Sequence, residues 1–175
     1  KCIEWLEKKP KEYAALNNLA CAYENLGDLE NLKKLCEKAM KDHPNKVVHL
    51  YSLMEAHVNV KQFEEALDVY HQIKSIDPND LYSDLCRASI HAMEGDNESA
   101  LMLLERIFFA TYGRKRVIKY QIGPKYYAKA CYDLARAYLR VGRIEDAMQI
   151  CKLHPHVSSY NKEYGRKLKR LGENY

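Results

Sequence analysis

The chain has 175 residues, enough for one domain with a buried core, and its 47% of apolar residues exclude a disordered polymer and a membrane-embedded protein. No apolar run approaches the roughly 20 residues that cross a bilayer, and residues 1–10 lack the apolar stretch of a secretion signal. The net charge of +4 hides an asymmetry, because residues 1–105 carry 12 Lys and Arg against 19 Asp and Glu, whereas residues 106–175 carry 16 against 5. We therefore expect a cytoplasmic protein, with the nucleus as an alternative, whose two parts differ in electrostatic potential.

Six cysteines are spread singly through segments with helical periodicity. A secreted domain held together by disulfides would be short and rich in loops. We expect reduced thiols, which serve mainly as small buried apolar side chains.

Three prolines divide the first part of the chain at equal intervals, since Pro10, Pro44 and Pro78 are separated by 34 residues each. A fixed period of this size is typical of stacked supersecondary units. Proline has no amide hydrogen, so it fits just after a helix and can end it at little cost. The alignment predicts repeats at residues 13–46, 47–80 and 81–114.

The first two repeats have the apolar spacing of two amphipathic helices joined by a tight turn. The turn falls at Gly27-Asp28 in the first repeat and at Lys61-Gln62 in the second. Helices of about a dozen residues are marginal alone in water, so they must pack against their neighbours. The apolar positions expected in the core are Leu16, Leu19, Ala20, Tyr23, Leu32, Cys36 and Ala39, then Leu50, Leu53, Met54, Ala66, Tyr70 and Ile73.

The second part of the chain continues the pattern with one interruption. The third repeat has its turn at Gly95-Asp96 but carries Tyr112 where the closing proline is expected. Residues 115–127 follow as a basic insertion, after which residues 128–155 form a short fourth repeat. The fourth repeat includes Leu134, Ala135, Tyr138, Gly142 and Ala147 in register.

Both ends of the chain have a distinct pattern. In residues 156–175, Tyr160, Tyr164 and Leu168 recur at four-residue intervals, which predicts one helix that caps the stack, because end repeats need a polar outer face. Residues 1–12 align with the second helix of an earlier repeat. We therefore expect the sequence to be part of a longer protein.

The residues at these spacings resemble the tetratricopeptide repeat family. The first repeat departs from the family pattern at Leu32 and Cys36, and the second at His57, Lys61 and Ile73. The resemblance implies an all-α, right-handed α-solenoid of stacked helix-turn-helix repeats, a single domain over residues 1–175 that ends in a capping helix. Its implied function is a protein-protein interaction scaffold that binds a peptide or helix of a partner in the concave groove.

The resemblance also implies which residues face the groove, since family members bind through fixed positions on the first helix of each repeat. At these positions the sequence has Asn17, Cys21, Glu24, Asn25, Tyr51, Glu55, Asn59, Lys129, Tyr132, Arg136 and Arg140. The groove would then be mildly acidic at its start and basic at its end. One family use is a Lys, Arg and Asn clamp for the terminal carboxylate of a chaperone tail. Asn17, Cys21 and Glu55 depart from that clamp, and a carboxylate facing Glu55 would be repelled.

The basic insertion offers an alternative function, the binding of RNA or another phosphate-bearing ligand. Cations attract phosphates, and tyrosine rings outside the core register can stack on bases. The competing interpretation is a solvated loop whose charges keep it soluble. The cationic candidates are Arg114, Lys115, Arg116, Lys119 and Lys125, and the aromatic ones are Tyr120, Tyr126, Tyr127 and Tyr132.

No motif for catalysis is present, because the sequence lacks a glycine-rich phosphate loop, a nucleophile elbow and a zinc-protease helix. Cys151, His154 and His156 have the side chains of a zinc site, but Pro155 separates the histidines and the register places Cys151 in the core. We therefore expect no enzyme activity, no metal and no cofactor. The sequence leaves the partner and the oligomeric state open.

Overall fold

The computed structural model describes residues 13–115 and 122–175, which form ten α-helices and no strand. The prediction of an all-α fold of stacked helix-turn-helix pairs is confirmed. The chain divides into two compact units, residues 1–79 (unit 1) and residues 80–175 (unit 2). Among the described helices none is long and apolar enough to span a membrane.

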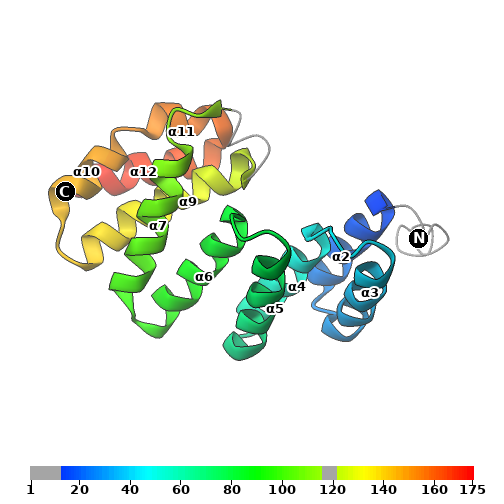
Figure 1. Cartoon of the computed structure of the whole chain (residues 1–175). Helices are drawn as coiled ribbons and strands as arrows, with labels where there is room; N and C mark the ends of the chain where they lie inside the picture. The colour runs from blue at the N-terminus through cyan, green and yellow to red at the C-terminus, as the bar shows by residue number, and fades with distance from the viewer. Residues whose placement is uncertain (1–12, 116–121) are drawn as a thin grey trace. The chain divides into compact units, whose positions relative to one another are not determined.

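Unit 1 contains two helical hairpins (Figure 1). The first is formed by α2 (Tyr13–Leu26) and α3 (Leu29–Asp42), and the second by α4 (Val48–Asn59) and α5 (Phe63–Ile76). The hairpins stack because α4 packs against both α2 and α3. Every apolar position predicted for the core of these repeats is buried, and Ala20, Ala39 and Ala66 are completely buried, which lets the helices approach closely.

The turns of unit 1 fall where the sequence predicts them. Gly27 has φ 70°, a left-handed conformation that glycine adopts without steric cost. Asp28 then caps α3, since its Oδ1 accepts a hydrogen bond from the Asn31 amide at 3.2 Å. In the second hairpin Lys61 takes the place of the glycine and has φ 61°. At this turn a lysine therefore adopts a backbone conformation that suits glycine.

Unit 2 contains six described helices that share one core. They are α6 (Leu81–Glu94), α7 (Asn97–Thr111), α9 (Pro124–Arg140), α10 (Ile144–Cys151), α11 (His154–Tyr160) and α12 (Lys162–Glu173). The helix α9 is central, because α7, α10, α11 and α12 all pack against it. Its buried face includes Ala128, Cys131, Leu134 and Ala135, none of which is exposed.

The last residues of the predicted basic insertion belong to a helix. We expected residues 115–127 to interrupt the helices, but α9 begins at Pro124, which lies at its first turn. Proline fits this position because the first helical amides have no partner within the helix. The first turn of α9 carries Tyr126 and Tyr127.

The carboxyl-terminal segment contains two helices where the sequence predicts one. Asn161 has extended backbone angles, φ −153° and ψ 112°, which end α11. Its Oδ1 accepts hydrogen bonds from the amides of Glu163 at 3.0 Å and Tyr164 at 3.2 Å, so Asn161 caps α12. The helices pack at Gly165, where an added Cβ would lie 2.8 Å from the Cα of Ser158. The grouping of the helix pairs into repeats remains our interpretation of the sequence.

Candidate functional site

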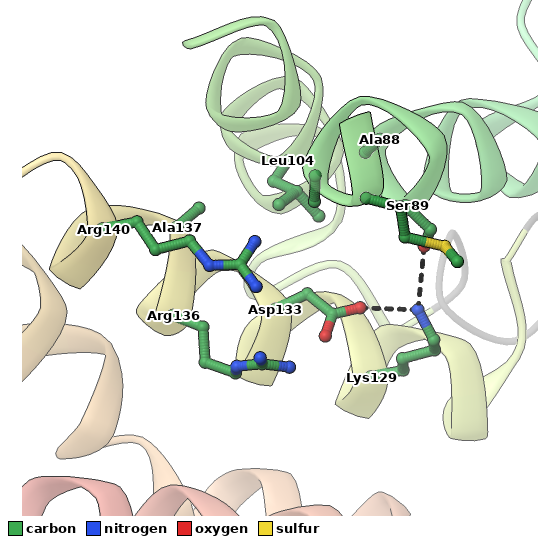
Figure 2. Close-up of a pocket in the computed structure, with 10 residues that line it drawn as sticks. Ala88, Ser89, Leu104, Lys129, Asp133, Arg136, Ala137 and Arg140 are labelled. Carbon is green, nitrogen blue, oxygen red and sulfur yellow. Dashed lines mark hydrogen bonds and ion pairs between the residues drawn. The ribbon is translucent and has the colours of Figure 1, made fainter. Parts of the chain in front are cut away.

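A cavity of about 350 Å³ lies in unit 2 between α6 and α9. Its apolar lining consists of three alanines, Met93 of α6 and Leu104 of α7. The short alanine side chains leave space between the helices. The wall from α9 is charged, and its residues recur at three- and four-residue intervals on one face of that helix (Figure 2). The lining residues are Ala88, Ser89, Ala92, Met93, Leu104, Lys129, Asp133, Arg136, Ala137 and Arg140.

One end of the cavity is held by a small polar network. Lys129 Nζ lies 2.6 Å from Asp133 Oδ2 and donates a hydrogen bond to Ser89 Oγ at 3.2 Å, which links α9 to α6 (Figure 2). Burial alone would lower the pKa of Lys129, but the neighbouring Asp133 carboxylate outweighs it and keeps this pKa above its usual value. Lys129 is therefore protonated at neutral pH, and its charge is matched by Asp133.

The other two cations of the cavity wall have no such match. The Arg136 and Arg140 side chains are exposed, and no ion pair to either guanidinium exists among the residues that the structure describes. Arg136 instead lies over the ring of Tyr132, 5.6 Å from its centroid. The cavity thus carries three cations and one carboxylate, and its unmatched charge comes from two arginines.

Tyr132 belongs to an aromatic and cationic patch beside this wall. Its ring centroid lies 6.0 Å from that of Tyr164 on α12. Lys167 Nζ lies 4.8 Å from the Tyr164 centroid and 5.9 Å from the Tyr132 centroid. Lys167 also pairs with Glu163 at 2.6 Å. Packing of α12 against α9 therefore brings Lys167 near the Tyr132 ring, which also lies beside Arg136.

The structure brings together the four groove residues predicted on α9. Lys129, Arg136 and Arg140 line the cavity, and Tyr132 contacts Arg136. Their role in binding stays a prediction. Sequence reasoning missed Asp133, although its spacing of four residues from Lys129 places both on one helix face. It also missed Ser89 and Tyr164, which lie far from α9 in the sequence and leave no signal in its periodicity.

The groove residues predicted in unit 1 lie on α2 and α4. Asn17 is part of α2, and its side chain is outside the described part of the structure. Cys21 Sγ lies 3.6 Å from the buried Ser52 Oγ, and Asn25 Nδ2 donates to the Cys21 carbonyl at 2.7 Å. On these two helices Glu24, Tyr51 and Glu55 are half-buried, whereas Asn59 is exposed.

Only some of the candidates from the basic insertion lie in the described residues. Arg114, Lys115 and Lys125 are exposed, whereas Arg116, Lys119 and Tyr120 lie outside the described residues.

The interpretation of Tyr127 as a side chain available to a partner is wrong, because its ring is completely buried against Tyr160. This burial raises the pKa of Tyr127 above its usual value. Tyr126 is half-buried and packs edge-on against Tyr82, with centroids 4.4 Å apart.

The candidate metal cluster does not come together in the described residues. Cys151 is buried in the core of unit 2, and burial raises the pKa of its thiol. His156 packs edge-on against Tyr160 instead, with centroids 5.2 Å apart. No group of three His, Cys, Asp or Glu side chains in the described ranges is arranged to hold a metal ion.

Comparison with known proteins identifies helical repeats in both units. The profile of the tetratricopeptide repeat family matches residues 13–41 and 128–153. The second match includes most of α9 and therefore the charged wall of the cavity. No match to the chain was found among curated proteins.

Solved structures with the same fold cover nearly the whole chain. TTC0263, a thermophilic TPR protein of Thermus thermophilus, has a TM-score of 0.72 at 18% identity, over 95% of this chain and 84% of its own. Pseudomonas aeruginosa pilF has a TM-score of 0.66 at 12% identity, over 95% and 77%. MamA protein has a TM-score of 0.59 at 14% identity, over 91% and 80%. At these identities the likeness establishes the fold.

Proposed function

Because the chain is a tetratricopeptide repeat protein, we propose that it is a protein-interaction scaffold, and that an acidic segment of a protein partner binds in the cavity between α6 and α9. Repeat proteins of this kind present a surface to a partner and rely on a few anchor residues for affinity. The proposal includes no catalytic step. The observation that carries it is the unmatched pair of arginines in the cavity wall.

Arg136 and Arg140 suit a carboxylate-bearing ligand. A guanidinium presents a rigid fork of donors that bonds both oxygens of a carboxylate, and such charge-assisted bonds are stronger than neutral ones. Both arginines are on one helix face, separated by four residues, so a single short segment can reach both. Asp133 does not compete for them, because it pairs with Lys129.

The remaining residues of the cavity favour a ligand that carries apolar side chains next to its acidic ones. Ala88, Leu104 and Ala137 form an apolar surface in the cavity, and Met93 at its edge is 49% exposed. Methionine adapts its shape to different ligands, so it suits a surface that receives an apolar side chain. We therefore propose that the bound segment alternates Asp or Glu with at least one apolar residue.

A selection of random dodecapeptides on the intact chain tests this function, followed by fluorescence polarisation with the enriched sequences. We expect enrichment in Asp and Glu, and a loss of affinity of at least about tenfold in the variant Arg136→Glu/Arg140→Glu. The matched control is Arg166→Glu/Arg170→Glu, which makes the same charge change at exposed positions of α12 that do not line the cavity. An equal loss of affinity in both variants would show that binding depends on the net charge of the chain alone, which would contradict the proposal.

RNA binding is the second candidate function. It is favoured by the exposed cations Arg114, Lys115 and Lys125 and by the Tyr132 and Tyr164 rings with their neighbouring cations. A titration with fluorescent single-stranded RNA at two salt concentrations separates the candidates, because phosphate binding releases counterions and weakens steeply with salt. Tight, salt-sensitive binding that is lost in Arg114→Ala/Lys115→Ala would favour RNA over an acidic peptide.

A further inference from the structure

A groove of about 550 Å³ lies in unit 1, on helices that the proposed function does not use. One wall comes from α3 and the other from α5. These are the second helices of the two hairpins (Figure 1). Residues of α4 complete the lining, and α4 packs against both walls. The apolar lining includes Leu53 and Val69, which are almost completely buried, and Met40, which is partly exposed.

The groove follows the two wall helices for about two turns. Its lining extends from Lys33 to Lys41 on α3 and from Glu65 to Gln72 on α5. At about 1.5 Å per residue these stretches are about 11–12 Å long. A helical segment of about two turns has the same length. One of its faces would lie on the floor of the groove, which is formed by the apolar residues Leu53, Val69 and Met40.

The two walls carry net charges of opposite sign, because on α3 the two lysines outnumber one glutamate, whereas both charged residues of α5 are acidic. The α3 wall has Lys33, Glu37 and Lys41, and the α5 wall has Glu65 and Asp68. All five side chains are exposed, and none forms an ion pair with another described residue. The apolar residues at the bottom of the groove therefore lie between a wall of net positive charge and an acidic wall, and the charges of both walls are available to a ligand.

We propose that this groove binds a short amphipathic helix of a protein partner, with its apolar face on the floor, an acidic edge along α3 and a basic edge along α5. An amphipathic helix in an apolar groove is held by residues one turn apart, and the wall charges of α3 recur at that interval. Complementary charge on both walls sets the register and excludes helices whose edges carry a single sign. This site is independent of the cavity between α6 and α9.

Three designed helical peptides of 15 residues, labelled with fluorescein, test the proposal on the intact chain. All three have Leu at helical intervals on one face, and they differ in the flanking edges, which are Glu and Lys, Lys on both sides, or Glu on both sides. We expect the mixed peptide to bind about tenfold more tightly than either of the others. Its binding should shift the methyl resonances of Leu53 and Val69 in NMR spectra.

Charge reversal of one wall provides the second arm of the test. In the variant Lys33→Glu/Lys41→Glu both walls are acidic, so we expect the preference to change from the mixed peptide to the Lys peptide. The matched control is Lys34→Glu/Lys38→Glu, which reverses two exposed lysines of α3 outside the groove and disrupts only the surface pair of Lys34 with Glu30. The control should keep the preference for the mixed peptide.

Several outcomes would overturn the proposal. They are equal affinity for the three peptides, an unchanged preference after the wall is reversed, or methyl shifts that avoid Leu53 and Val69. Self-association of the chain that is lost in Lys33→Glu/Lys41→Glu would assign the groove to a second copy instead. The variant Arg136→Glu/Arg140→Glu should bind the mixed peptide normally, so failure here is distinguishable from failure of the proposed function.

Discussion

The hydroxyl of Tyr138 on α9 donates a hydrogen bond to Glu105 Oε1 on α7 at 2.7 Å. Arg143, just before α10, donates to the same oxygen at 3.0 Å, and its guanidinium carbon lies 4.5 Å from the centroid of the Tyr138 ring. Burial, together with this bond to the carboxylate, raises the pKa of Tyr138 above its usual value. The three residues tie successive helix pairs of unit 2 together.

The variant Tyr138→Phe should lower the free energy of unfolding by about 1–2 kcal/mol, because it removes a hydrogen bond to a charged group while keeping the ring in place. Urea denaturation followed by circular dichroism measures the change. Tyr112→Phe is the control, since the Tyr112 ring is 49% exposed and stacks on Phe108 through its face. Equal stability of Tyr138→Phe and the native chain would show that the bond to Glu105 contributes nothing.

The variant Lys61→Gly should stabilise the chain by about 0.5–1 kcal/mol. Lys61 has φ 61°, where a side chain is strained and glycine is not, although glycine loses more conformational freedom on folding. Thermal unfolding of the variant should show a higher midpoint. Lys46→Gly, in the loop between α3 and α4, serves as a comparison because Lys46 has no positive φ. A lower midpoint for Lys61→Gly would mean that the backbone strain at Lys61 is negligible.

The variant Gly165→Ala should destabilise unit 2 by about 1–3 kcal/mol, the usual cost of forcing extra atoms into a packed interior. The added Cβ would lie 2.8 Å from the Cα of Ser158, so α11 and α12 could not keep their present separation. Arg170→Ala on the exposed side of α12 is the control and should change stability by less than about 0.5 kcal/mol. Retention of full stability in Gly165→Ala would contradict the close packing of these two helices.

Acid should destabilise the chain through His49. Its ring is completely buried, and neither ring nitrogen has a hydrogen-bond partner in the described structure. The pKa of His49 is lowered from 6.5 to about 4, mainly by burial and to a smaller extent by the nearby His43. Between these values the unfolded chain binds the proton and the folded chain does not, so stability falls as the pH drops from about 6.5 to about 4.

Urea denaturation at pH 7 and pH 4.5 of the native chain and of His49→Leu measures this effect. The native chain should lose about 2 kcal/mol more than the variant over this range. Both proteins share every other titratable group, so the difference reports the titration of His49 together with its coupling to His43. The same pH dependence in both proteins would show that His49 does not supply it.

The repeat cores could be predicted because apolar residues at helical spacing determine which face of a helix is buried. The burial of Leu16, Met54 and Ile73 follows from this spacing. The start of α9 could not be predicted in the same way, because an insertion of unknown conformation interrupts the register. The burial of Tyr127 was missed because the register at the start of α9 was not known. Its ring also packs against Tyr160 of α11, a contact that the local sequence does not indicate.

The candidate site was also predictable only in part. The positions of Lys129, Arg136 and Arg140 follow from their register on α9, which the family resemblance supplied. The contact of Lys129 with Ser89 joins residues that are 40 positions apart, and no local pattern encodes it. The break between α11 and α12 depends on the backbone of Asn161, which caps α12. The sequence alone does not indicate that a helix starts at this asparagine, so its capping role could not be predicted.

The most direct test of the proposed function is an NMR titration of the intact chain with a selected acidic peptide, followed through the methyl groups of Ala88, Leu104 and Ala137. These side chains line the cavity between α6 and α9. We predict saturable shifts at all three, which disappear in Arg136→Glu/Arg140→Glu. Binding that leaves these three methyl groups unshifted would place the peptide elsewhere and contradict the assignment of this cavity as the partner site.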